Sequence, residues 1–346
     1  MSKPRNLILP NHILPNHDRR QFLKHSAVAV AAGASLTGIV KADDKAAASQ
    51  PESLVKVLFD SLKQEQRSKV CYAWDHIDPK RGLLRTRVAS NWMINEQEIN
   101  SDFYTAEQKD LIRKIFEGVI QPEWHANFDK QMDDDCGGFG EEQSIAIFGQ
   151  PGDGKFEFVL TGRHMTLRCD GNSIENVAFG GPIFYGHAPG GDEEADHHGN
   201  VFWSQALEAN KIYQMLDGKQ RKVAEVAKTP REQSVGFQGK GSPFTGIPVT
   251  DLSADQRAQM QLTLGKLVEP FRKTDRDEAM QCLTAQGGLD ACNLSFFTDN
   301  DIGNDKLWDN WRLEGPSFVW HYRGAPHVHV WVNIADNAKV ELNAEG

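Results

Sequence analysis

Histidine is the residue type in this sequence whose spacing points most directly to chemistry, and two histidines lie close together near the C-terminus. In the run PHVHVWVNI, His327 and His329 are two residues apart in a segment whose alternation predicts a β-strand. Because side chains alternate between the two faces of a strand, both imidazoles and Trp331 should share one face, and the intervening valines should enter the core. Two imidazoles at this spacing can bind one metal ion.

Three further histidines are candidates for completing such a site. His164 lies in GRHMTLRCDG, His187 ends IFYGHAP, and His321 lies in WHYRG, just before the His-x-His run. Three neutral imidazoles with one open coordination position suit a divalent ion of zinc, copper or iron. The alternative is structural, because a His-x-His pair on a strand is often only a polar face and single strand histidines are often hydrogen-bonded core residues.

His164 is the third ligand that we favour, and its position makes a geometric demand. Phe156, Phe158 and Leu160 have the same parity as His164, so an unbroken strand would place its ring among apolar side chains. A bulge at Gly162 would change the register and redirect the ring. If the three histidines share an ion, their ring nitrogens should lie within about 4.5 Å of one another, and separations beyond about 8 Å would exclude His164.

Helical and strand-like periodicities follow one another along the rest of the chain. Helices are predicted over 51–67, 106–120, a short stretch after Pro122, 202–227, and 254–283 with a break near Pro270. Thr105, followed by Gln108, resembles a capping box. Strands are predicted over 144–149, 155–171, 176–186, 311–324 and 326–334, and a long loop over 230–248. These runs predict one large α+β domain over 51–346, with a mainly antiparallel central sheet and flanking helices.

The N-terminus has the pattern of an export signal. Arg19 and Arg20 form a twin arginine in DRRQFLK, a short apolar stretch covers 26–40, and small residues precede Asp43. We therefore assign 1–42 to a twin-arginine signal peptide and 43–50 to a polar linker. The twin-arginine translocase is the expected partner during export, to the periplasm or beyond. No later segment approaches the roughly 18 apolar residues of a membrane span, so we expect no membrane association after signal removal.

Composition and failed motifs exclude several function classes. The 346 residues carry a formal net charge of −10, and the export signal contains six of the 38 basic side chains but only one of the 48 acidic ones. The rest of the chain is therefore strongly acidic. Such a surface repels the phosphates of nucleic acid, so we do not expect nucleic acid as a partner.

Two short motifs also lack residues that their chemistry requires. The run GQPGDGK lacks the Ser or Thr of a phosphate-binding loop. The acidic run Asp133–Asp135 lacks the ligand order of a calcium loop, so we expect it to be solvated. Cys282 and Cys292 are either a local disulfide or two buried thiols.

Several of these motifs occur together in a known order. In chain order they are GRHMTLRCDG, FGGPIFYG, a helix SQALEANKIYQMLDGKQRKVA, GIPVTDLSADQRAQMQLTLGKLVEPF and EGPSFVWHYRGAPHVHVWVN. This series resembles a bacterial, often exported family catalogued as domain of unknown function 3500. The resemblance covers about residue 50 to the C-terminus and implies a Gly-His-His motif and a final His-x-His strand. Here Arg163 replaces the first histidine of that motif, and His321 replaces a more usual acidic residue, whereas His164, His327 and His329 match.

Two functions fit these observations. The first is a metal-dependent exported enzyme, in which Arg163 orients an anionic substrate group and Tyr185 or Glu208 donates a proton; hydrolysis and oxidation both remain open. The second is a non-catalytic periplasmic protein that binds a metal ion or a small ligand on the same sheet face. The substrate or small-molecule ligand is not defined by the sequence. An enzyme needs an open coordination position near a proton-transfer group, whereas a binding protein does not.

The export signal gives a direct prediction. Replacing Arg19 and Arg20 together with lysine should leave the protein in the cytoplasm, because the translocase selects the paired guanidinium groups. Cell fractionation followed by immunoblotting measures this. Normal export of the double variant would show that the route is assigned incorrectly.

Overall fold

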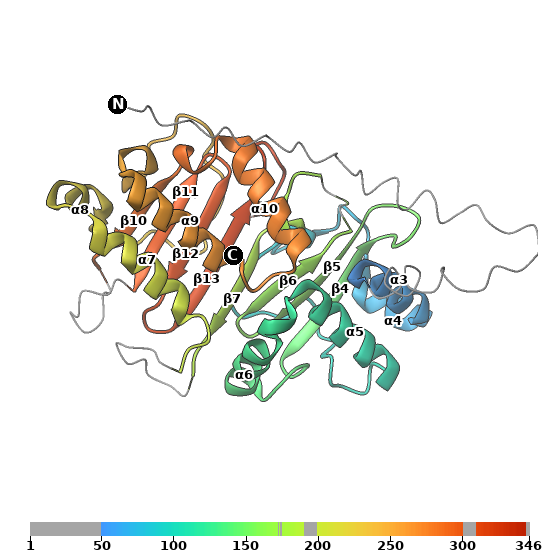
Figure 1. The fold of residues 1–346 in the computed structure, drawn as a ribbon. Coiled ribbons are helices and arrows are strands. Elements are labelled where there is room, and N and C mark those ends of the chain that lie inside the picture. The colour runs from blue at the N-terminus through green and yellow to red at the C-terminus, as the bar shows by residue number, and fades with distance from the viewer. Residues whose placement is uncertain (1–49, 172, 174, 190–198, 300–308, 344–346) are drawn as a thin grey trace, which may run out of the picture. The chain divides into compact units, whose positions relative to one another are not determined.

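A single large sheet organises the part of the chain that this computed structural model describes, namely residues 50–343 without 172, 174, 190–198 and 300–308. Eleven strands within these ranges belong to it (Figure 1). In spatial order they are β1 (Cys71–Tyr72), β4 (Gln143–Gly149), β5 (Phe156–Gly162), β6 (Met165–Cys169), β7 (Ile183–His187), β13 (Val328–Ile334), β12 (Phe318–Arg323), β11 (Asn310–Gly315), β10 (Asn293–Phe297) and β8 (Glu225–Val226), with β9 (Ile247–Pro248) paired to β10.

The sheet is mixed, which corrects the expected mainly antiparallel sheet. Strand β1 runs parallel to β4, and β8 runs parallel to β10, at the two ends of the sheet. Each of these two-residue strands begins where a helix ends, and the chain reaches its partner strand only through further helices. Helical crossovers of this kind allow parallel pairing, whereas short hairpins do not. The broader expectation of a chain that combines helices with a large sheet is confirmed.

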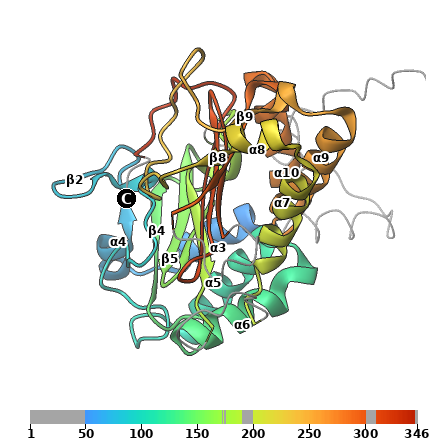
Figure 2. The ribbon, with the colours of Figure 1, turned by 90° about the vertical axis from the view of Figure 1, so that its left-hand side faces the viewer.

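Helices cover one face of the sheet. They are α3 (Pro51–Ser61), α4 (Gln64–Val70), α5 (Ala106–Val119), α6 (His125–Cys136), α7 (Trp203–Met215), α8 (Gly218–Ala224), α9 (Ala254–Val268) and α10 (Lys273–Gln286). Short 3-10 helices are η2 (Leu84–Thr86), η3 (Pro122–Trp124), η4 (Ala178–Gly180), η5 (Val249–Asp251) and η6 (Leu289–Ala291). In Figure 2 the sheet is seen nearly edge-on, with α7, α9 and α10 on one side. Apolar residues of these helices and of alternate strand positions form the main core.

The local signals for these helices are confirmed in part, and the helix expected over 202–227 is instead α7, α8 and the strand β8. Thr105 caps α5 through a capping box with Gln108. The helical stretch expected from 254 is broken around Pro270, between α9 and α10. The helix expected over 51–67 is instead two helices, because Leu62 and Lys63 adopt extended backbone angles between α3 and α4.

Extended and loop segments cover the other face, which we call the loop face. Residues 73–101 cross it and include the small hairpin of β2 (Ile77–Asp78) and β3 (Gly82–Leu83) (Figure 2). A buried ion network fixes this segment, because Glu157 on β5 accepts hydrogen bonds from Arg85 and from Arg168 on β6. All three side chains are at most 6 % exposed. Residues 228–246 cover a second part of this face, where Val235 packs against Trp331.

The segment 155–171 differs from the single strand that its pattern predicts. It is a hairpin in which β5 and β6 pair through Gly162 and Met165, so Arg163 and His164 form a two-residue turn. His164 has a φ of +54°, a left-handed conformation that this tight turn requires. We expected a bulge at Gly162 to redirect the His164 ring. The turn at Arg163 and His164, directly after Gly162, redirects it instead.

Three further observations bear on the domain and its chemistry. Residues Lys45–Gly346 form one compact unit, whereas the predicted export signal lies outside the described residues. Among the residues that the structure describes, no helix is both long enough and apolar enough to cross a membrane. Cys282 and Cys292 are separate, buried thiols rather than a disulfide.

Candidate metal centre

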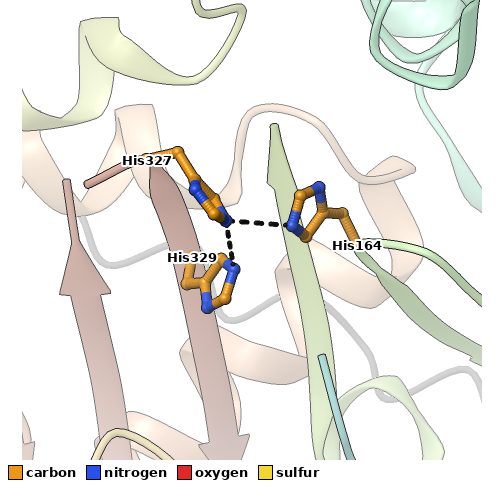
Figure 3. Close-up of side chains that lie close together, drawn as sticks. All are labelled: His164, His327 and His329. Atoms are coloured by element: carbon orange, nitrogen blue, oxygen red, sulfur yellow. Dashed lines mark hydrogen bonds between the residues drawn. The ribbon is translucent and has the colours of Figure 1, made fainter. Parts of the chain in front are cut away.

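Three imidazoles converge at one end of the central strands. The Nε2 atom of His327 lies 3.2 Å from Nε2 of His164 and 2.9 Å from Nε2 of His329 (Figure 3). Each of the three offers one ligand atom, and these atoms all lie within 4.8 Å of one another. Nitrogen ligands about 2.0–2.1 Å from a shared ion stand about 3–3.5 Å apart in tetrahedral geometry, so the 3.2 Å and 2.9 Å separations fit a bound metal, and no pair reaches the separation of about 8 Å that would exclude His164. We call these residues the histidine trio.

Strand β7 is what brings the trio together. It pairs with β6 on one side and with β13 on the other, so the turn that carries His164 lies near the start of β13. His327 immediately precedes β13 and His329 is its second residue. The three imidazoles therefore come from two segments more than 160 residues apart in the sequence, and the intervening strand β7 holds these segments in register.

Gly186 on β7 allows this close approach. Its N–H donates to the carbonyl oxygen of His164, and it is the cross-strand partner of His329. A Cβ atom at this position would lie 2.4 Å from the carbonyl oxygen of Val328 and 3.4 Å from the His329 ring. Only glycine fits here without displacing β13, the strand that carries His329.

The faces of β13 are as the alternation predicts. Val328, Val330 and Val332 belong to the main core on the helix side. Trp331 lies on the opposite, loop face, where it packs against Phe184. His329 shares this face and contacts the edge of the same phenylalanine ring, so the imidazole is not part of the main core.

Two carboxylates orient the trio from outside. Asp135 of α6 lies 2.7 Å from Nδ1 of His164, and Glu232 of the loop lies 3.0 Å from Nδ1 of His329. A carboxylate next to Nδ1 accepts its proton, which leaves the Nε2 lone pair free for a metal. Carboxylate–histidine pairs of this kind are the usual outer support of histidine ligands in metal sites.

The two carboxylates are themselves held in place. Asp135 accepts hydrogen bonds from Gln131 and from the N–H of Ala188, and its side chain is fully buried. Glu232 accepts hydrogen bonds from the indole N–H of Trp331 and from Arg323. Because each acceptor has several donors, the carboxylates can fix the tilt of the imidazoles as well as their tautomers.

The electrostatic environment keeps two of the three imidazoles neutral. Burial, together with the charges of the neighbouring histidines, lowers the pKa of His327 to about 3. Burial lowers the pKa of His329 to about 4, although the hydrogen bond that its ring donates to Glu232 opposes the shift. Burial alone would raise the pKa of Asp135, but the interaction with His164 outweighs it and lowers that pKa below its ordinary value. Neutral imidazoles beside ionised carboxylates are the protonation states that a metal site needs.

The other candidate ligands lie elsewhere. His187 is on the helix side, where its Nε2 lies 2.9 Å from Asp134 and its Nδ1 accepts the N–H of Val201. His321 is buried on β12, where its Nδ1 accepts a hydrogen bond from Arg312. Neither His187 nor His321 contributes a ring nitrogen to the histidine trio.

The candidate catalytic residues are also dispersed. The hydroxyl of Tyr185 is buried on the helix side and donates to Gln205. Glu208 lies on α7, paired with Lys211 and Gln259. Arg163 is the neighbour of His164 in the hairpin turn and is half-buried; its Nε is buried and has no hydrogen-bond partner among the residues that the structure describes. Of the three, only Arg163 comes from the element that carries a trio ligand.

The sequence did not reveal the two supporting carboxylates. Asp135 was expected to be solvated, but it lies in the last turn of α6 with its side chain buried against His164. Glu232 lies in the segment 230–248, for which the composition predicts a long loop without a helix or strand. Neither has a local signal, because each is recognised only by its contact with a distant histidine.

A comparison with known protein families gives one match. The family model described as "Protein of unknown function (DUF3500)" matches residues 44–333, a range that includes the histidine trio and both carboxylates. No curated protein sequence and no solved structure matches the chain.

The tight packing at β7 gives a prediction about the centre. Gly186→Ala should destabilise the protein by about 1–3 kcal/mol, because the new Cβ displaces the β13 backbone, and it should shift the imidazole NMR signals of the trio. Urea unfolding and long-range ¹H–¹⁵N spectra measure both effects.

The control for this substitution is Gly265→Ala, at an exposed helical position where a Cβ meets no atom within 4 Å. It should raise stability by about 0.5–1 kcal/mol and leave the imidazole signals unchanged. Equal behaviour of the two variants would mean that β7 does not constrain His329.

Proposed function

We propose that this chain, which belongs to the DUF3500 family, binds one divalent transition-metal ion through the Nε2 atoms of His164, His327 and His329. The observation that carries the proposal is the convergence of three Nε2 atoms from imidazoles of which two have Nδ1 held by a carboxylate. Without an ion, the three Nε2 atoms would face one another with lone pairs that repel or with N–H groups that cannot all find an acceptor. A metal ion satisfies all three at once.

The donor set defines the class of ion and the chemistry it supplies. Neutral imidazole nitrogens suit zinc, copper or ferrous iron and disfavour magnesium and calcium. Three protein ligands leave an open coordination position, at which such an ion lowers the pKa of a bound water or polarises a substrate oxygen. His327 is the most exposed of the three rings, so we expect substrate and solvent to approach from its side.

The nearby charges support a divalent ion and an anionic fourth ligand. Asp135 and Glu232 contribute two negative charges, and Arg323 offsets one of them through its ion pair with Glu232. With a divalent ion the sum is near +1, which one hydroxide or one substrate carboxylate would neutralise. Arg163, next to His164, supports the same preference for an anionic group.

We infer that an open metal centre of this kind serves a metal-dependent enzyme. The competing function is non-catalytic metal binding, and one observation favours it: Tyr185 and Glu208 are engaged in other hydrogen bonds and do not supply a proton donor at the centre. The enzyme proposal therefore relies on a metal-bound water rather than on either side chain. Export through the twin-arginine route is proposed with it, since that route carries folded proteins whose cofactor is already inserted.

The proposal predicts that metal content depends on the trio. His164→Ala, His327→Ala and His329→Ala should each remove the roughly one equivalent of metal expected in protein purified from the exported pool. Far-UV circular dichroism should stay nearly unchanged, because valines rather than imidazoles fill the main core beneath β13. Asp135→Asn and Glu232→Gln should retain metal but lower its affinity about 10–100-fold. Elemental analysis and competition with a chelating dye measure these quantities.

His76→Ala is the matched control, since His76 is outside the trio and should keep full metal content. Wild-type protein that contains less than about 0.1 equivalent of metal, and takes up none when zinc, copper or ferrous iron is added, would contradict metal binding altogether.

A second prediction separates an enzyme-like centre from a closed binding site. In cobalt-substituted protein, azide should change the visible spectrum, because an open position accepts the anion. A spectrum that does not respond to azide, in protein shown to contain cobalt, would favour the non-catalytic function while leaving metal binding intact. Asp135→Asn serves as a control, since it keeps the ligand set and should still respond.

A further inference from the structure

Arg323, the last residue of β12, lies beside two of the three imidazoles. It is the direct cross-strand partner of His329, so both side chains lie on the loop face. Its Nη1 donates to Oε1 of Glu232 at 3.2 Å, and its Nη2 donates to the carbonyl oxygen of His327 at 3.3 Å. One guanidinium therefore contacts both the carboxylate that supports His329 and the main chain of His327.

His327 is the member of the histidine trio that has the least support from its surroundings. It lies between β12 and β13, outside the paired register, and its ring is half-buried whereas the other two rings are buried. Both His164 and His329 have a carboxylate at Nδ1. In the part of the chain that the structure describes, no side chain binds Nδ1 of His327. The hydrogen bond from Arg323 to its carbonyl oxygen supplies a restraint that the ring itself lacks.

The positive charge of Arg323 by itself works against a bound cation. It disfavours a further positive charge on His327 and on His329. By Coulomb's law the same charge repels a divalent ion, and its ion pair with Glu232 reduces the attraction that this carboxylate offers. A favourable contribution of Arg323 to metal binding must therefore come from geometry.

We propose that Arg323 is a positioning residue of the metal centre. Its two terminal nitrogens hold the carbonyl oxygen of His327 and the carboxylate of Glu232 at a fixed separation, because the planar fork of a guanidinium orients two acceptors at once. Glu232 in turn holds Nδ1 of His329, so the fork sets the spacing of the two rings, whose Nε2 atoms lie 2.9 Å apart. This role rests on the metal binding proposed above.

The segment between β12 and β13 has an anchor besides this side chain. The N–H of Gly324 donates to the carbonyl oxygen of Asp309 and to Oδ1 of Asn310, so the backbone directly after Arg323 is held at the start of β11. Substitutions at Arg323 should therefore leave the fold intact, which thermal unfolding checks.

Ring contacts in the metal-free protein test the positioning without any ion. The centroids of the His327 and His329 rings lie 4.6 Å apart, close enough for nuclear Overhauser effects between their protons. Arg323→Met, which removes both donors, and Arg323→Lys, which keeps the charge but not the fork, should each lose most of this signal. Glu232→Gln should keep it, because the contact to the main chain of His327 remains. Unchanged signals in both Arg323 variants would overturn the proposal.

Zinc affinity tests the same role through the sign of the change. Positioning predicts that Arg323→Met and Arg323→Lys bind zinc about 10-fold more weakly than the wild type, a loss typical of residues that support metal ligands. A purely electrostatic role predicts tighter binding by Arg323→Met, because a repelling charge is removed. Competition with a chelating dye measures the affinities. Equal or tighter binding by Arg323→Met overturns the proposal.

Arg113→Met is the matched control. Arg113 is also a half-buried, ion-paired arginine, 24 % exposed against 19 % for Arg323, but it lies on α5 and pairs with Glu117 and Asp129. It should keep the ring contacts and the zinc affinity of the wild type, and a loss equal to that of Arg323→Met would overturn the assignment. If the wild type binds no zinc, the proposed metal binding is contradicted, while the ring contacts still decide whether Arg323 positions His327.

Discussion

The hydrogen bonds that Asp135 and Glu232 accept from two imidazole Nδ1 atoms are the constraint on which the rest of the centre depends. They fix which nitrogen of His164 and of His329 faces inward, so the Nε2 atoms of these two rings, rather than their Nδ1 atoms, meet Nε2 of His327. The carboxylates come from opposite layers, one from a helix and one from the loop face. The proposed site therefore forms only when both α6 and the loop segment pack on the sheet, so its geometry depends on the complete tertiary structure.

The sheet supplies the register within which these hydrogen bonds act. Because β7 separates the hairpin of His164 from the strand of His329, a slip of one residue between β7 and β13 would turn the imidazole toward the main core and bring a valine to the loop face. The valines of β13 oppose such a slip, since it would expose them. Apolar burial on one face thus determines ligand geometry on the other.

Much of this arrangement follows from local patterns, and the remainder depends on contacts that no local pattern encodes. Alternation correctly predicted the two faces of β13, and the capping box correctly predicted the start of α5. The family resemblance is confirmed over residues 44–333. The turn at His164 was missed although the core positions change parity across it, from Phe156, Phe158 and Leu160 to Met165, Leu167 and Cys169. Asp135 and Glu232 could not be found because they lie 29 and 97 residues from the histidines they contact. The parallel edge strands are two residues long, too short to have any periodicity.

The position of β13 in the sheet has a consequence for how the molecule is assembled. This strand is the last in the described chain, yet it lies between β7 and β12 and joins the two halves of the sheet. Before β13 has been synthesised, β7 and β12 are edge strands. Their backbone N–H and C=O groups on the side of β13 are unpaired and can pair with strands of other chains. Assembly is completed by insertion of one strand into a prepared gap, and the same event delivers two of the three imidazoles. Completion of the sheet and formation of the proposed metal site are therefore a single late step, which no partially synthesised chain can reach.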